Sequence, residues 1–167
     1  MRKVRVYKNR KMRQPDIKFQ NLVVGRFINY LMREGKKSLA EKIFYETLEV
    51  IKKQTQQEPL KVFEKALENT QPLLAVVSRR IGGANYQIPM EVRPERKFFL
   101  ACNWIIEAAR AKKGKMMPEK LAEEIIAASK NEGAAIKKKL DMHRVAEANR
   151  AFAHFARRYN LCRDNTP

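Results

Sequence analysis

The sequence is poor in the residues that catalytic and metal-binding sites usually require. It holds two cysteines, two histidines and one tryptophan in 167 residues. Cys102 and Cys162 have no motif spacing, and nothing indicates an oxidising compartment. His143 and His154 share a helix face but lie about 16 Å apart along it, which is too far to hold one metal ion. No Ser or Cys nucleophile stands near a recognisable base, so the sequence predicts no enzyme and no cofactor.

Long apolar runs are missing as well. No stretch approaches the ~20 apolar residues of a membrane helix, and no signal-peptide core is present. The segment Gly35–Ser38 superficially matches the end of a phosphate-binding loop, but Tyr30 and Lys37 stand where that loop needs Gly and Ser or Thr. The sequence therefore argues against a membrane-spanning helix and against nucleotide binding. Lys36 and Lys37 are instead expected to contact phosphate from a loop.

Positive charge is what the sequence has in excess. It contains 36 Lys and Arg against 18 Asp and Glu, a net charge of +18. The net charge is +10 in residues 1–37, −1 in 38–72, +6 in 73–115 and +3 in 116–167. So basic a chain repels itself, which indicates a polyanionic partner. Nucleic acid and an anionic membrane surface are the candidates at this point.

Helical periodicity and breaker residues predict a mainly α protein. We expect a six-helix, bundle-like single domain over residues 15–158 with one protruding β-hairpin at about 73–93. A flexible basic N-terminal arm over 1–14 and a C-terminal tail over 159–167 flank it. The predicted helices run over about 21–33, from the capping box at 38–41, and over 59–69, 94–112, 118–131 and 132–158.

Three of these helices combine an apolar face with a basic one. In the sixth we expect Ile136, Leu140, Ala148, Ala151 and Phe155 to face inward. A single basic helix face is ordinarily only exposed to solvent. Three basic faces that contain almost no acidic residues indicate instead a surface that binds a row of phosphates. The expected stripes are Arg26, Asn29 and Arg33; Arg96, Asn103 and Arg110; and Lys139, His143, Arg150, His154 and Arg157.

The segment 79–94, RRIGGANYQIPMEVRP, alternates like a pair of strands and turns on two glycines. Gly82 and Gly83 accept the positive φ of a tight hairpin turn. One interpretation is structural: the apolar strand face that starts at Tyr86 would pack on the core, and the hairpin would only cover it. Four arginines at its predicted base favour an arm that lies along a nucleic-acid backbone: Arg79, Arg80, Arg93 and Arg96.

Four longer blocks carry a resemblance. They are GKKSLAEKI at 35–43, ALENTQPLL at 66–74, RRIGGANYQIPMEVRPERK at 79–97 and KNEGAAIKKKLDMHRVAEANRAFAHF at 130–155. In order and spacing they resemble the small-subunit ribosomal protein S-seven family in its bacterial form, from about Pro15 to Phe155. The chain departs from the usual family pattern in its N-terminal arm and in its continuation over 156–167.

The resemblance implies a specific role. Family members are six-helix proteins with one extended hairpin that bind small-subunit ribosomal RNA (rRNA) in the 3′ major domain and nucleate assembly of the head. They lie beside exit-site transfer RNA and the messenger path, and meet neighbouring ribosomal proteins of head and platform. Carried onto this chain, the rRNA-binding residues are Arg2, Lys3, Arg5, Lys8, Arg10, Lys11, Arg26, Asn29, Arg33, Arg79, Arg80, Arg93, Arg96, Asn103, Arg110 and Lys113. Those expected near messenger or transfer RNA are Lys36, Lys37, Gly82, Gly83, Asn85, Tyr86, Arg144 and Arg150.

Two alternatives stay open on the sequence alone. An architectural DNA-binding protein could use the hairpin as an arm, although it would need a dimer or a wedge residue at a tip that reads Gly, Gly, Ala, Asn. The acid-free N-terminus could be an organelle transit peptide, although it lacks serine enrichment and an amphipathic pattern. The expected location is the small ribosomal subunit in the cytoplasm, or that of an organellar ribosome.

Overall fold

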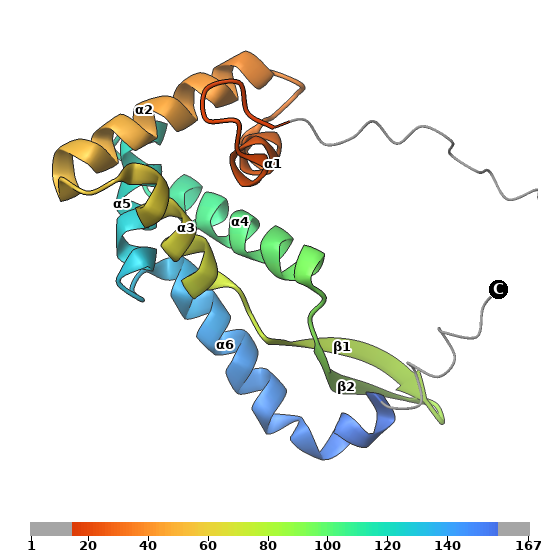
Figure 1. Ribbon diagram of the computed structural model, residues 1–167. Coiled ribbons are helices and arrows are strands. Elements are labelled where there is room, and N and C mark those ends of the chain that lie inside the picture. The colour runs from red at the N-terminus through yellow and green to blue at the C-terminus, as the bar shows by residue number, and fades with distance from the viewer. Residues whose placement is uncertain (1–14, 157–167) are drawn as a thin grey trace, which may run out of the picture. The chain divides into compact units, whose positions relative to one another are not determined.

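The computed structural model describes residues 15–156. Over these residues the chain forms six α-helices, one short 3-10 helix and one two-stranded antiparallel sheet (Figure 1), which confirms the predicted fold class. None of the described helices has an apolar stretch that could cross a bilayer. The predicted arm and the predicted tail at 159–167 lie outside the described residues. The chain divides into two compact units within a helix, between Lys42 and Ile43, and each is described in turn.

The first unit contains α1 (Leu22–Leu31) and the start of α2 (Lys37–Thr55). Asn21 caps α1, because its side-chain oxygen accepts a hydrogen bond from the Val23 amide at 2.8 Å. α1 ends two residues earlier than predicted and α2 begins one residue earlier, so Ser38 lies in the first turn of α2. The buried side chains of α1 are Val24, Phe27, Ile28 and Leu31.

The second unit holds most of the core. After the rest of α2 come α3 (Pro59–Thr70), α4 (Pro94–Ala111), α5 (Met117–Ser129) and α6 (Ala134–Ala148). α3, α4 and α5 each begin with proline at a first-turn position, where its missing N–H costs nothing. The rings of Phe44 and Phe63 meet edge to face at 5.3 Å, and Ile105, Leu121 and Ile125 are fully buried. α5 packs against both α3 and α4, and α6 packs against α4.

The hairpin joins α3 to α4. β1 (Leu74–Ile81) pairs with β2 (Ala84–Glu91), from Leu74 opposite Glu91 to Ile81 opposite Ala84. Gly82 and Gly83 form the turn with φ of +57° and +90°, the left-handed values that a two-residue hairpin needs. Figure 1 shows the turn pointing away from the helices of this unit, with α6 running beside the strands.

The start of α6 depends on a buried carboxylate that the sequence did not reveal. This carboxylate belongs to Glu124 on α5, which is only 1% exposed. One carboxylate oxygen accepts a hydrogen bond from the Ala135 amide at 3.0 Å, and the other lies 3.1 Å from Lys112 Nζ. An anion at a helix N-terminus satisfies amide groups that have no partner within the helix.

The predicted sixth helix is shorter than expected. α6 ends at Ala148, and a 3-10 helix, η1 (Arg150–Ala153), follows it. The Asn149 side chain donates to the Val145 carbonyl at 2.8 Å and closes the last turn. The predicted inward face was wrong at three positions, since Leu140 is 59% exposed and Ala148 and Ala151 are exposed too. The helical spacing of apolar residues continues past Asn149, but the chain bends there because η1 packs against β2.

Candidate nucleic-acid interface

The four hairpin arginines do not lie together. Arg79 faces Tyr86 and Arg80 faces Asn85 in the strand register, so both lie next to the turn. Arg93 precedes α4, and Arg96 lies in its first turn, at the other end of the hairpin. Six residues of strand separate the two pairs by about 20 Å. The prediction that all four lie at the base was therefore wrong for Arg79 and Arg80, because residues two and three positions before a turn at Gly82 and Gly83 lie at the tip of the hairpin.

Three of these guanidinium groups face solvent. Arg80, Arg93 and Arg96 are exposed, and no acidic side chain among residues 15–156 pairs with them. The Arg96 guanidinium lies over the Phe99 ring at 4.9 Å, a cation–π contact that orients it without neutralising its charge. The hairpin therefore carries uncompensated positive charge at both of its ends, in a geometry suited to phosphate groups.

The predicted stripe on α4 is only partly exposed. Asn103 and Arg110 are half-buried, whereas Lys113, just beyond the helix, is exposed. Its neighbour Lys112 forms ion pairs with Glu123 at 3.5 Å and with Glu124 at 3.1 Å. Of these two adjacent lysines, Lys113 is the one left for an external anion.

In the first unit the predicted basic residues occupy a helix and a loop. Arg26 is half-buried and Asn29 exposed on α1, while Arg33 is exposed beyond the end of that helix. Lys36 lies in the loop and Lys37 is the first residue of α2, and both have acidic neighbours: Lys36 Nζ lies 2.8 Å from Glu34 and Lys37 Nζ lies 3.8 Å from Glu41. Pairs between exposed side chains contribute roughly 0–1 kcal/mol, so a phosphate could replace either carboxylate at little cost.

Besides Lys36 and Lys37, the residues expected near messenger or transfer RNA fall into two groups. Gly82, Gly83 and Asn85 are exposed at the turn. Tyr86 is half-buried, because its ring contacts Phe152 at 5.2 Å and Phe155 at 5.8 Å.

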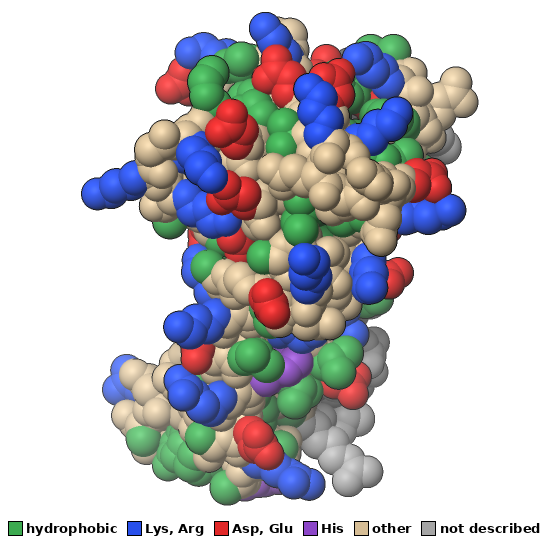
Figure 2. Space-filling view, turned by 90° about the vertical axis from the view of Figure 1, so that its left-hand side faces the viewer, with side chains coloured by type: hydrophobic (Ala, Val, Ile, Leu, Met, Phe, Trp, Pro, Cys, Tyr) green, Lys and Arg blue, Asp and Glu red, His purple; other side chains and the backbone are tan. Residues whose placement is uncertain are grey.

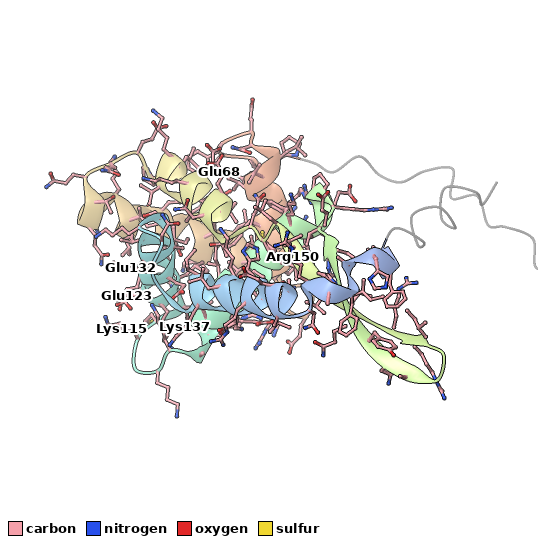
Figure 3. The ribbon with its side chains drawn as sticks, turned by 90° about the horizontal axis from the view of Figure 1, so that it is seen from below. Glu68, Lys115, Glu123, Glu132, Lys137 and Arg150 are labelled. Carbon is pink, nitrogen blue, oxygen red and sulfur yellow. The ribbon has the colours of Figure 1, made fainter. Side chains whose placement is uncertain are left out.

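The other two residues of that set lie on α6 and η1. Arg144 is exposed and pairs with Asp141 at 2.9 Å. Arg150 is exposed at the start of η1. Figure 3 labels it toward the hairpin end of the helix, with Lys115 and Glu123 beside the other end.

The basic stripe predicted on the sixth helix was wrong at two positions. Lys139 and His143 are only partly exposed and face the link between α3 and β1. Lys139 Nζ donates to the Asn69 carbonyl at 2.5 Å, and the Leu73 amide donates to His143 Nε2 at 3.0 Å. The last carbonyls of α3 lack helical partners and require such donors, which is the signal that could have indicated an inward lysine.

The partly buried positions of Lys139 and His143 change the pKa values of both side chains. Burial lowers the pKa of Lys139 below its ordinary value. Burial also lowers the pKa of His143, and the nearby charge of Lys139 lowers it further. A neutral His143 is the form that can accept the Leu73 N–H, so the geometry and the pKa direction agree. The last predicted member of that stripe, Arg157, lies outside the described residues.

The basic charge does not cover every face. In Figure 2, acidic and basic side chains intermingle, and hydrophobic side chains gather beside a histidine in the lower part of the view. No three potential metal ligands cluster anywhere in residues 15–156. The six arm residues of the predicted rRNA set lie outside the described residues: Arg2, Lys3, Arg5, Lys8, Arg10 and Lys11.

Fold and charge together define a basic, mainly helical protein with a projecting arginine-bearing hairpin. The model of the family described as ribosomal protein S7p/S5e matches residues 1–150, and the chain belongs to this family. It is 56% identical over 141 residues to a protein of Thermotoga maritima named small ribosomal subunit protein uS7, covering 84% of this chain and 91% of that relative. Proteins of the same name from Endomicrobium trichonymphae and Salinibacter ruber are 56% and 54% identical, each over 85% of this chain and over 89% and 91% of the relative.

Proposed function

We propose that this chain is a structural protein of the small ribosomal subunit that binds rRNA directly in the 3′ major domain and nucleates assembly of the head. Its family consists of structural ribosomal proteins and not of enzymes. The observation that carries the rRNA contact is the set of exposed arginines at the two ends of the hairpin, which are Arg80 beside the turn and Arg93 and Arg96 at the base. Residues 15–158 act here as one RNA-binding domain, with the arm 1–14 as an additional contact.

The way this chain binds RNA follows from its charge pattern. Arginines along a hairpin and asparagines on helix faces reach phosphate and sugar, so folded RNA is bound by shape more than by base sequence. The exposed Gly82, Gly83 and Asn85 have no bulk to clash with a second RNA, and we propose that they lie near exit-site transfer RNA. Lys36 and Lys37 would then lie near messenger, with neighbouring proteins of head and platform around the chain.

The first experiment compares two polyanions. The full chain is titrated with the isolated 3′ major domain of small-subunit RNA and with duplex DNA of equal length, at several salt concentrations. RNA-selective binding that persists at ~0.2 M salt is expected for a specific ribosomal site. Equal and salt-sensitive binding to both would overturn the proposal and indicate a generic polyanion binder.

Substitutions then test the hairpin. Arg79→Ala with Arg80→Ala is expected to weaken RNA binding and to lower the slope of log affinity against log salt by about 1.5, because each lost phosphate contact removes ~0.7 to 0.9. Arg93→Ala with Arg96→Ala is expected to have the same effect at the other end. Lys52→Ala with Lys53→Ala removes equal charge from exposed positions on α2 and serves as the control.

Circular dichroism checks that helical content is unchanged in all three double variants. If both hairpin variants match the control in slope and affinity, the hairpin is not part of the interface.

A further inference from the structure

A groove lies between the hairpin and two helices of the second unit (Figure 1 shows the three elements). Its volume is about 490 Å³. One strand face supplies one wall, α6 supplies the other, and the indole of Trp104 on α4 lies between them. The residues of this groove that matter below are Val76, Ser78, Gln87, Trp104, Met142 and Val145.

The indole N–H of Trp104 has no acceptor among residues 15–156, although the side chain is only 8% exposed. A buried indole N–H ordinarily finds a hydrogen-bond partner, because it can only donate. Its Nε1 is not among the enclosed side-chain atoms of the described chain that lack a partner, so the N–H is not sealed inside the protein. Since Trp104 lines the groove, this donor is accessible to a ligand in the groove.

Two polar side chains of the hairpin are available beside it. Ser78 and Gln87 lie opposite each other in the strand register, and both line the groove. The Ser78 hydroxyl has no partner among residues 15–156. The Gln87 side-chain oxygen accepts from Asn149 at 3.5 Å, the long limit of a hydrogen bond, and its NH₂ group donates to no described residue. The groove therefore offers several free donors to a ligand that carries acceptor atoms.

The remaining walls are apolar and only partly covered. Val76 and Met142 are half-buried, and Val145 is 41% exposed. Apolar walls with a few directional polar groups are typical of sites for small, flat ligands. A nucleobase has both matching properties, since its faces are apolar and its edge carries carbonyl and ring-nitrogen acceptors.

Positive charge lies at one end of the same strand face. Ser78 and Arg80 point to the same side of β1 and lie about 7 Å apart, because alternate residues of a strand share a face. That separation is comparable with the distance between the phosphate and the base of one nucleotide. Arg80 is exposed and has no acidic partner in residues 15–156, whereas the groove residues Lys138 and Asp141 are in ion pairs at 2.6 and 2.9 Å. A phosphate is therefore attracted to the Arg80 end, which favours RNA over an apolar peptide as the occupant.

We propose that this groove binds one unstacked nucleobase of single-stranded RNA, with the phosphate of that nucleotide on Arg80. The base lies between the strand face and the side chains of Met142 and Val145, and its edge accepts hydrogen bonds from Trp104 and Gln87. This subsite rests on the proposed RNA binding and deepens it, because it adds a contact to a base where the ends of the hairpin contact phosphates.

The test compares two polyanions of equal charge. The full chain is titrated with a short oligouridine, whose bases stack little on one another, and with a ribose-phosphate oligomer of the same length that lacks bases. Oligouridine is expected to bind at least about fivefold more tightly, the low end for one stacked base. Trp104 is the single tryptophan, and its emission is expected to be quenched by oligouridine only. Equal affinities with unchanged emission would overturn the proposal.

Two substitutions on α6 place the base in the groove. Val145→Phe fills the groove without changing charge, and it is expected to reduce the affinity for oligouridine to that for the oligomer without bases. Leu140→Phe is the matched control, since it lies at an exposed position on the same helix, outside the groove. The slope of log affinity against log salt is expected to stay the same in both variants, because the phosphate contacts remain. If Val145→Phe and Leu140→Phe behave alike, the base is not bound in the groove.

Gln87→Leu tests the hydrogen bond without filling the groove. It is expected to weaken oligouridine binding about threefold, the effect of one lost hydrogen bond, and to leave binding of the oligomer without bases unchanged. Circular dichroism checks the helical content of every variant. Equal weakening with both oligomers would contradict the assignment of Gln87 to a base edge.

The outcomes separate this subsite from the proposed function. RNA-selective binding to the 3′ major domain without any difference between the two oligomers overturns the base subsite alone. Absence of RNA-selective binding to that domain overturns the proposed function, whatever the oligomers show. Quenching of Trp104 by a short leucine-rich peptide and not by oligouridine would also overturn the base subsite and assign the groove to a protein segment.

Discussion

At the scale of single residues, buried polar side chains stabilise the second unit, and the spacing of apolar residues in the sequence does not indicate them. Glu124 is almost fully buried between α4 and α6, whereas Glu123, its neighbour in the chain, is one-third exposed and pairs with Lys112 and Lys115. Gly133 lies directly against this site: its φ is +97°, and a Cβ there would lie 2.8 Å from Glu124 Oε1. Glu123 and Glu124 are therefore expected to differ greatly in their contributions to the free energy of unfolding.

Glu124→Ala is expected to lower the free energy of unfolding by about 3 kcal/mol, because it leaves the buried Ala135 amide without its acceptor and Lys112 without its main partner. Glu123→Ala, the matched control, is expected to cost less than about 1 kcal/mol, since it removes only partly exposed ion pairs. Urea denaturation of both variants measures the difference. Equal losses would contradict the assignment of Glu124.

His143 gives the second prediction at this scale. Its pKa is lowered in the folded chain, so the unfolded chain takes up a proton first as the pH falls. The His143 contribution to stability is therefore fully present above about pH 6.5, the ordinary value, and is lost as the pH falls toward the lower folded pKa. Thermal unfolding between pH 5 and 8 is expected to show this loss in the natural chain.

His143→Gln is the control, because an amide oxygen can accept the Leu73 N–H without titrating. The difference in melting temperature between the natural chain and this variant is expected to change only below about pH 6.5. If the difference is the same at every pH, His143 is not the titrating group.

At the scale of elements, the hairpin is not an independent arm. A two-stranded sheet alone is marginally stable in water, and this one is supported by α6 on its strands and by η1 on β2. The bend at Asn149 makes the second contact possible, because it turns Phe152 and Phe155 onto Tyr86. The position of the arginines next to the turn thus depends on three aromatic rings.

Phe152→Ala is expected to cost about 1–2 kcal/mol through the lost ring packing, and to speed hydrogen exchange of the β2 amides before those of α3 to α5. Leu140→Ala, at a 59% exposed position on α6, is expected to change stability by less than about 0.5 kcal/mol. Hydrogen exchange read by mass spectrometry checks both. Protection of β2 that is unaffected by Phe152→Ala would show that η1 does not support the hairpin.

At the scale of the whole molecule, only part of the net charge of +18 is available to a binding partner. Some lysines that the sequence counts as positive are neutralised within the chain, such as Lys112 by Glu124 and Lys138 by Glu107. Other basic side chains, among them Arg80 and Arg93, face solvent without an acidic partner in residues 15–156. Net charge therefore predicts the class of partner, while the arrangement of ion pairs selects the residues that can meet it.

The sequence by itself determined the fold class, both bounds of four of the six main helices to within about two residues, the start of a fifth, and the hairpin with its glycine turn. These features follow from local physics: periodic apolar residues, proline at helix starts and glycine at positive φ. The resemblance carried by its longest blocks also indicated the family, which the comparisons confirm.

Only the tertiary structure decided where the sixth helix bends, which way Lys139 and His143 face, and that Glu124 is buried. These depend on partners distant in sequence, such as the carbonyl of Asn69 and the amides of Leu73 and Ala135. The periodicity of a helix predicts which residues share a face. It does not predict which polar group of another helix or strand contacts that face. Because backbone groups at helix ends must find partners, such contacts are fixed by packing and not by local sequence.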